Sequence, residues 1–194
     1  MQNYTKNYFK YVLGFIFCFL LRLIPFRPPN IEPLLATQMP FAKTYGKLAG
    51  FMFGFLSIIL YDIITAKVGI WTLITATVYG ILGLFATMYF KNKKNKAWNY
   101  AKFAIFATIF YDAITGLTIG PLFFHQSFTA SLAGQIPFTI LHLTGNICFA
   151  VVFSPLIYKY IIENQKLPAR NRLSEAMAGG EVPNIIKILN PKQI

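Results

Sequence analysis

Residues 69–90 read GIWTLITATVYGILGLFATMYF and contain no charged side chain. A helix needs roughly 20 mostly apolar residues to cross the hydrocarbon core of a bilayer. An uncharged apolar run of this length is typical of a transmembrane helix. The stretch therefore places the chain among the integral membrane proteins.

The sequence on either side repeats this pattern. Four more segments reach the spanning length, at about 8–26, 47–65, 101–120 and 132–162. The last of them is long enough to tilt, or to emerge into the cytoplasm as a helix. A sixth candidate, at about 30–45, is short and contains Pro33 and Pro40, so its hydropathy leaves open whether it crosses the membrane.

The distribution of lysine decides the number of crossings. If 30–45 crosses, the basic clusters all fall on one side of the membrane, as the positive-inside rule expects. These clusters are Lys6 and Lys10, Lys43 and Lys47, Lys91 to Lys96, and the tail from Lys166. Without that crossing, Lys91 to Lys96 would lie opposite the N-terminus. We therefore predict an all-α bundle of about six transmembrane helices over residues 1–162, with both termini in the cytoplasm and a basic cytoplasmic tail over 163–194.

The composition agrees with this fold class. The chain is 56% hydrophobic and only 12% charged, whereas soluble domains carry about 25% charged residues. Its net charge of +12 arises because few acidic side chains accompany the basic ones, and the basic residues flank apolar runs as they do in membrane proteins. We predict a multi-pass protein of the plasma membrane that contacts the lipid bilayer and binds no nucleic acid.

The first predicted loop holds candidate binding residues. Residues 22–33, RLIPFRPPNIEP, carry two arginines on the side of the membrane that should be poor in positive charge. The four prolines make the segment stiff and extended, so we expect a rigid cover over the outer mouth of the bundle. Its candidate solute-binding residues are Arg22, Arg27, Asn30 and Glu32. In the alternative, Arg22 reaches lipid headgroups and pairs with Glu32.

Two carboxylates, Asp62 and Asp112, follow tyrosines near the outer ends of two spans. A carboxylate at membrane depth costs about 2.5–3.5 kcal/mol on insertion scales, which favours a functional role. The alternative is an interfacial carboxylate that accepts hydrogen bonds at a helix end. Paired membrane carboxylates could also share a proton, as in an intramembrane aspartyl protease. The Gly-x-Gly-Asp motif of those enzymes is absent, and we expect both carboxylates to lie near the surface.

The remaining polar candidates lie on the later spans and at the outer end. His142 and Asn146 are four residues apart on one face of the last span, where polar side chains normally point into the bundle. They could contact a ligand or neighbouring helices. Trp71 and His125 complete the set of candidate binding residues, although Trp71 could simply anchor its helix at the interface.

Small residues indicate close helix packing. Gly46, Gly50 and Gly54 share one helix face, where another backbone can approach closely, either in the same chain or in another subunit. Gly14 and Cys18 form a weaker pair of this kind on the first span. The two cysteines have no His or Cys at metal-ligand spacing, so we predict neither a metal site nor a disulfide.

Taken together, these features resemble the substrate-binding S components of energy-coupling factor (ECF) transporters, small six-helix proteins that capture vitamins and related micronutrients. The resemblance covers about residues 8–162. It lies in the size, in the six-span plan and in three stretches: residues 22–30, the glycine-rich residues 49–55 of a span that ends in Tyr61-Asp62, and residues 69–80.

The resemblance implies a protein without catalytic residues or a cofactor. Such a subunit binds a small-molecule substrate from outside, beneath the first loop, and docks on a transmembrane coupling subunit driven by two ATP-binding subunits. The chain has no Gly-x-x-x-x-Gly-Lys-Ser/Thr motif, so ATP would be hydrolysed by these partners. It departs from the family by carrying Gly14-x-x-x-Cys18 where the docking helix usually has Ala-x-x-x-Ala. A membrane scaffold that transports nothing is the alternative, because the glycine face would suffice for it.

Overall fold

The computed structural model describes residues 2–24 and 32–163, and these are helical without a strand. The elements are α1 (Gln2–Leu23), α2 (Leu34–Tyr45), α3 (Lys47–Ile64), α4 (Ile70–Phe90), α5 (Ala97–Gly116), the short α6 (Ile119–Phe123), α7 (Phe128–Leu156) and the π-helix η1 (Ile157–Ile162). The predicted all-α polytopic fold is confirmed.

Within the described residues, four helical stretches are long and apolar enough to cross a membrane, namely Lys47–Ile64, Ile70–Phe90, Ala97–Phe123 and Phe128–Ile162. The last two begin about one turn earlier than predicted. At the start of α7, Ser127 caps the helix by accepting a hydrogen bond from the Ala130 amide at 3.3 Å, which hydropathy does not reveal. The segment 30–45 forms α2, whose 12 residues extend only about 18 Å at 1.5 Å per residue.

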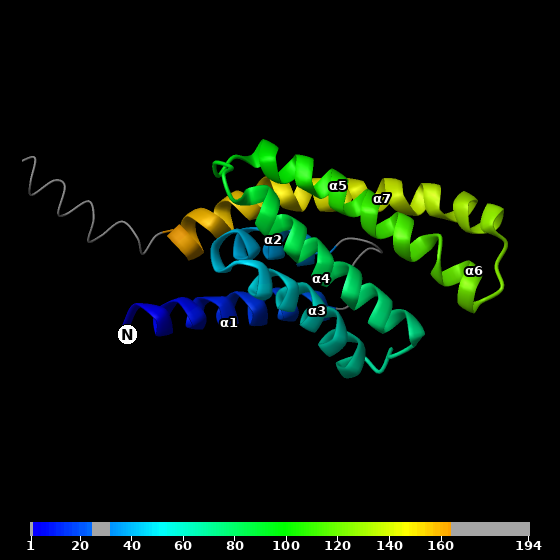
Figure 1. The fold of residues 1–194 in the computed structure, drawn as a ribbon, viewed down its shortest axis with the longest axis horizontal. Coiled ribbons are helices and arrows are strands. Elements are labelled where there is room, and N and C mark those ends of the chain that lie inside the picture. The colour runs from blue at the N-terminus through cyan, green and yellow to red at the C-terminus, as the bar shows by residue number, and fades with distance from the viewer. Residues whose placement is uncertain (1, 25–31, 164–194) are drawn as a thin grey trace, which may run out of the picture.

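The principal helices run alternately in opposite directions, α1, α3 and α5 one way and α2, α4 and α7 the other (Figure 1). This alternation brings the lysine-bearing ends together. The Lys43 ammonium lies 4.2 Å from the centre of the Tyr158 ring in η1, and the Asn95 amide, between α4 and α5, donates to the Pro155 carbonyl at 3.3 Å. Lys10 of α1 donates to the Ile161 carbonyl at the same end. We call this the lysine-rich end and the opposite one the outer end.

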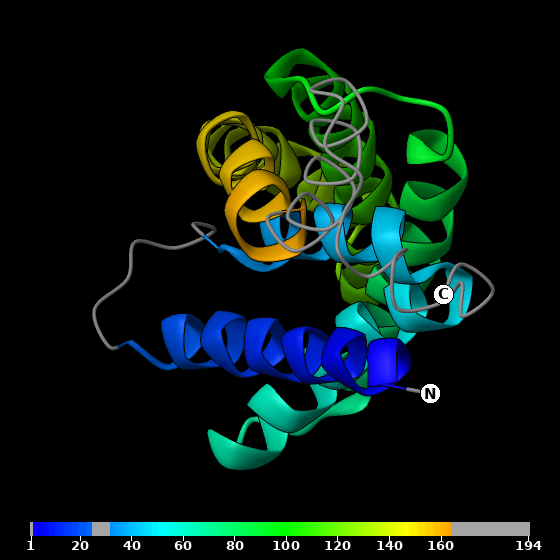
Figure 2. The ribbon, with the colours of Figure 1, turned by 90° about the vertical axis from the view of Figure 1, so that its left-hand side faces the viewer.

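Helix α2 forms the centre of the bundle. Its residues from Leu34 to Ala42 are all buried, and it contacts α1, α3, α4, α5, α7 and η1. In the turned view, α2 lies between α1 and the pair formed by α5 and α7 (Figure 2). Pro40, inside α2, has no N–H to offer the Ala36 carbonyl. That carbonyl instead accepts a hydrogen bond from Ser154 of α7 at 2.7 Å, so the proline links two helices.

Glycines let α3 and α4 touch backbone to backbone. A Cβ at Gly50 would lie 2.7 Å from the Gly83 carbonyl oxygen, and one at Gly54 would lie 2.6 Å from the Tyr79 carbonyl oxygen. The glycine face of α3 therefore packs within its own chain. Gly46 differs, because nothing lies within 4 Å of its Cβ position. Its φ of 91° instead makes the tight junction between α2 and α3.

The small-residue pair on α1 also faces the chain itself. A Cβ at Gly14 would lie 2.0 Å from the Phe41 ring of α2, and Cys18 is completely buried in the same core. The other face of α1 is apolar and exposed, with Leu13, Phe17 and Leu20 each more than half accessible. That exposed face is the part of α1 available to the lipid or to a partner.

A substitution at Gly83 tests the α3–α4 contact. In Gly83→Ala the new methyl group would lie 2.0 Å from the Gly50 carbonyl oxygen, so the helices must separate. We expect the free energy of unfolding in detergent to fall by roughly 1–3 kcal/mol. The control is Gly134→Ala in α7, where nothing lies within 4 Å and the change should be neutral or slightly stabilising. Equal effects of the two substitutions would contradict this packing.

Candidate functional site

A buried arginine organises the outer half of the bundle. Arg22, in the last turn of α1, is 2% exposed. Its Nη1 donates to the Ser57 carbonyl of α3 at 2.6 Å, and its Nη2 lies 3.3 Å from Glu32 Oε2. The guanidinium carbon also lies 4.5 Å from the centre of the Tyr61 ring. The predicted pairing with Glu32 is therefore present, but Arg22 is held inside the protein instead of reaching lipid headgroups.

A carboxylate–imidazole pair joins α5 to α7. The Nδ1 of His142 lies 2.8 Å from Asp112 Oδ1, and both side chains are buried. Since a carboxylate accepts, we assign Nδ1 as the donor. One turn further, the Asn146 amide donates to Thr108 Oγ1 at 2.9 Å. The antiparallel helices are thus joined by two successive polar contacts.

Two tyrosine side chains pack next to this carboxylate–imidazole pair. The rings of Tyr79 and Tyr111 have centroids 4.6 Å apart, and Tyr111 packs edge-on against His142 at 5.8 Å. Arg22, Glu32 and Asp112 lie within electrostatic range of both tyrosine hydroxyls. The structure therefore gathers four of the predicted residues, Arg22, Glu32, Asp112 and His142, around two tyrosines, with Asn146 one turn below. We call this group the polar cluster.

Several atoms of the polar cluster lack a hydrogen-bond partner among the described residues. They are Arg22 Nε, Asp112 Oδ2 and Asn146 Oδ1, and each is buried. The buried hydroxyl of Ser57, whose carbonyl accepts from Arg22, also lacks a partner there. Buried polar atoms in proteins almost always have partners, because leaving one unsatisfied costs roughly 1–3 kcal/mol. Donors and acceptors of this kind, next to closely packed aromatic rings, suit a polar solute with a flat ring.

The two carboxylates of the sequence have different surroundings. Asp62 Oδ2 accepts a hydrogen bond from Thr72 Oγ1 at 2.5 Å, and Thr72 Oγ1 in turn accepts from the Gly69 amide at 3.1 Å. Asp62 therefore ties the end of α3 to the start of α4. Asp112 is 1% exposed, so the expectation that it lies near the surface was wrong. It lies deeper because the helical chain continues past it, through α5 and into α6.

The other predicted residues lie apart from the polar cluster or outside the described residues. Trp71, at the outer start of α4, is 38% exposed and stacks on Phe124 with centroids 6.2 Å apart. His125 is exposed, with a φ of 53°. Arg27 and Asn30 fall in the part of the first loop that the structure does not describe.

Sequence analysis missed some residues that position the polar cluster. Gln38 Nε2 donates to the carbonyls of Gly50 and Tyr79, both at 2.9 Å, and so links α2, α3 and α4 beneath the tyrosines. A single glutamine in a short, mostly apolar segment gave no signal in the sequence. Thr108 could have been found, since it lies four residues before Asp112 and therefore on the same helix face.

The polar cluster shows no arrangement of metal ligands. Within residues 2–24 and 32–163, no group of three or more His, Cys, Asp or Glu side chains could hold an ion. The polar cluster offers hydrogen-bonding groups, charges and aromatic rings. These groups suit the non-covalent binding of a solute.

The family model of the S component of ECF-type riboflavin transporters matches residues 11–109, about half of the chain. The chain belongs to this family. No curated protein and no solved structure matches it.

As an ECF S component, the chain is a substrate-binding subunit of an uptake transporter and not an enzyme. S components of this type work with a membrane ECF module of transmembrane and ATPase subunits. The matched residues contain Arg22, Glu32 and Tyr79 but end before Asp112. Asp112 and His142 lie outside the matched range. Their place in the candidate site of this S component therefore rests on the geometry of the structure and not on the family match.

A double-mutant cycle tests the Asp112–His142 contact. We compare Asp112→Asn, His142→Asn and the double variant by their free energies of unfolding in detergent mixtures. Because the two side chains bond directly at 2.8 Å, we expect a coupling energy of about 0.5–3 kcal/mol.

The matched control replaces Asp112→Asn by Asp62→Asn, since Asp62 bonds to Thr72 and not to His142. Its effect should add to that of His142→Asn. Additivity in both cycles would show that the Asp112–His142 contact is not formed.

Proposed function

We propose that this S component captures riboflavin, or a closely related flavin, at the outer face of the plasma membrane and delivers it to its ECF module for uptake. The observation that carries the proposal is the match to the riboflavin transporter S component family over residues 11–109. The polar cluster supports it, because it combines rings with hydrogen-bonding groups in an otherwise apolar bundle.

The chemistry of a flavin suits the polar cluster. A flavin presents a flat tricyclic ring system, a pyrimidine edge that donates and accepts hydrogen bonds, and a chain of hydroxyl groups. Tyr79, Tyr111 and His142 offer ring faces and edges. The partnerless atoms of Arg22, Asp112 and Asn146 offer one donor and two acceptors. We assign the ring to the tyrosines and the polar edge to these three side chains.

The outer candidates have separate proposed roles. Arg27, Asn30 and Glu32 belong to the proline-rich first loop, which we propose as the cover over the bound solute. Trp71, in the first turn of α4, and His125, between α6 and α7, lie at the outer end and would contact the solute on entry. Asp62, bonded to Thr72, would hold the rim of the site in place next to Tyr61.

The proposed partners are a transmembrane coupling subunit and two ATP-binding subunits. The usual small-residue docking pattern on the first helix is replaced by Gly14 and Cys18, and both face α2 or the core. We therefore propose that the coupling subunit contacts the opposite face of α1, through large side chains such as Leu13, Phe17 and Leu20.

The alternative of a membrane scaffold that transports nothing loses its support. It relied on a free glycine face on α3, and that face is covered by α2 and α4.

Titration with riboflavin tests the proposed function. The purified full chain in mild detergent should quench riboflavin fluorescence saturably with one site per chain, and thiamine should not compete. In Arg22→Gln we expect roughly ten- to a hundredfold weaker binding, since a hydrogen bond to a charged group contributes about 1.5–3 kcal/mol.

The control is Lys67→Gln, which removes an exposed cation outside the polar cluster and should leave the affinity unchanged. Gel filtration and the thermal midpoint establish that each variant is folded. Wild-type protein that is folded but does not bind riboflavin would contradict the proposal.

A further inference from the structure

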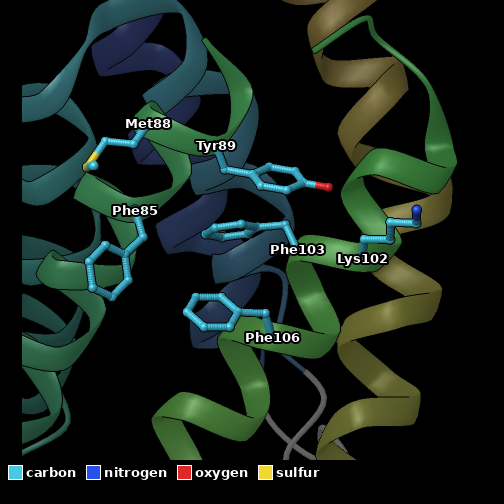
Figure 3. Close-up of a pocket in the computed structure, with 6 residues that line it drawn as sticks. All are labelled: Phe85, Met88, Tyr89, Lys102, Phe103 and Phe106. Carbon is cyan, nitrogen blue, oxygen red and sulfur yellow. The ribbon is translucent and has the colours of Figure 1, made fainter. Parts of the chain in front are cut away.

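A cavity lies away from the polar cluster, between α4 and α5. It is an open groove of about 540 Å³, within the range of roughly 300–1,000 Å³ typical of small-molecule sites. Its lining residues are Phe85, Met88 and Tyr89 from α4 and Lys102, Phe103 and Phe106 from α5 (Figure 3). We call it the α4–α5 groove.

The walls of the groove are aromatic and packed against one another. Phe85 contacts Phe106 with ring centroids 6.0 Å apart, and Tyr89 contacts Phe103 at 5.4 Å. Met88 is 61% exposed and Phe106 48% exposed, so the groove opens to the outside of the bundle. In a membrane-spanning bundle this outside is lipid.

One edge of the groove is basic. Figure 3 shows the Lys102 amine and the Tyr89 hydroxyl at the same edge, away from Met88. A second ammonium, that of Lys93, lies 5.5 Å from the centre of the Tyr89 ring. The connection between α4 and α5 also contains Lys91, Lys94 and Lys96.

This positive charge is not neutralised within the described part of the chain. The ion pairs found there are Arg22 with Glu32 and His142 with Asp112, both in the polar cluster. Lys102 contacts the Trp98 ring at 5.4 Å but no carboxylate. An apolar slot with uncompensated lysines at one edge is complementary to an amphiphile with a negatively charged head.

The groove lies towards the lysine-rich end, because Met88 and Tyr89 are in the last turn of α4 and Lys102 is in the second turn of α5. By the positive-inside rule this end faces the cytoplasm, and the cytoplasmic leaflet contains anionic lipids. We propose that the α4–α5 groove binds one anionic phospholipid of this leaflet. An acyl chain lies between the aromatic walls, and the phosphate lies against Lys102 and Lys93.

Brominated lipids test this site through Trp98. The chain has two tryptophans, so Trp71→Phe leaves Trp98, next to Lys102, as the reporter. The full-length variant is reconstituted in phosphatidylcholine vesicles with increasing brominated phosphatidylglycerol or brominated phosphatidylcholine. We expect the phosphatidylglycerol to bind near Trp98 about fivefold more strongly, and Lys102→Gln to remove the preference.

The matched control is Trp98→Phe, which leaves Trp71 at the outer end as the reporter. It should show no preference for the anionic lipid. Equal quenching of Trp98 by the two lipids would overturn the proposal, as would an undiminished preference in Lys102→Gln.

A photo-crosslinking amino acid in place of Met88, in native membranes that contain the transporter partners, identifies the occupant directly. An adduct with the mass of an anionic phospholipid supports the proposal. An adduct with a protein subunit would overturn it and assign the groove to docking.

Discussion

Helix α2 has twelve residues, is buried along most of its length and contacts all the other principal helices. Such an element can be central only if its polar groups find partners, because an unsatisfied group in an apolar interior costs about 1–3 kcal/mol. Gln38 supplies two hydrogen bonds, to the carbonyls of Gly50 and Tyr79. Ser154 supplies the bond that Pro40 cannot make to Ala36. These contacts fix the positions of α3, α4 and α7 around α2.

The polar cluster depends on that arrangement. Tyr79 lies in α4 at the point where Gln38 holds the helix, and Tyr79 in turn contacts Tyr111 of α5. The Asp112–His142 pair then joins α5 to α7. Arg22 reaches the same region from α1 by bonding to Ser57 of α3. Charges this far from water are costly in a membrane protein unless they are paired or functional. Here they are paired, while Arg22, Asp112 and Asn146 each keep one polar atom available to a solute.

The fold was largely predictable from the sequence, whereas the site was predictable only in part. Uncharged runs such as 69–90 indicate spans whatever their neighbours are, and the lysine clusters indicate which ends lie together. Arg22, Asp112 and His142 could be found because charge is rare in such segments. Their partners could not, since the contact between Asp112 and His142 depends on how far α5 and α7 slide past each other. Gln38 was missed because its function is to bond backbone carbonyls of other helices, for which no sequence pattern exists.

The central claim, that this chain captures a solute for an ECF transporter, is tested most directly by isolating it from its native membrane. The chain is purified in mild detergent, and mass spectrometry identifies both the associated proteins and any retained small molecule. The account predicts a transmembrane coupling subunit with ATP-binding subunits, and a flavin released on denaturation. Recovery of the folded chain with unrelated membrane proteins and without a small molecule would contradict it.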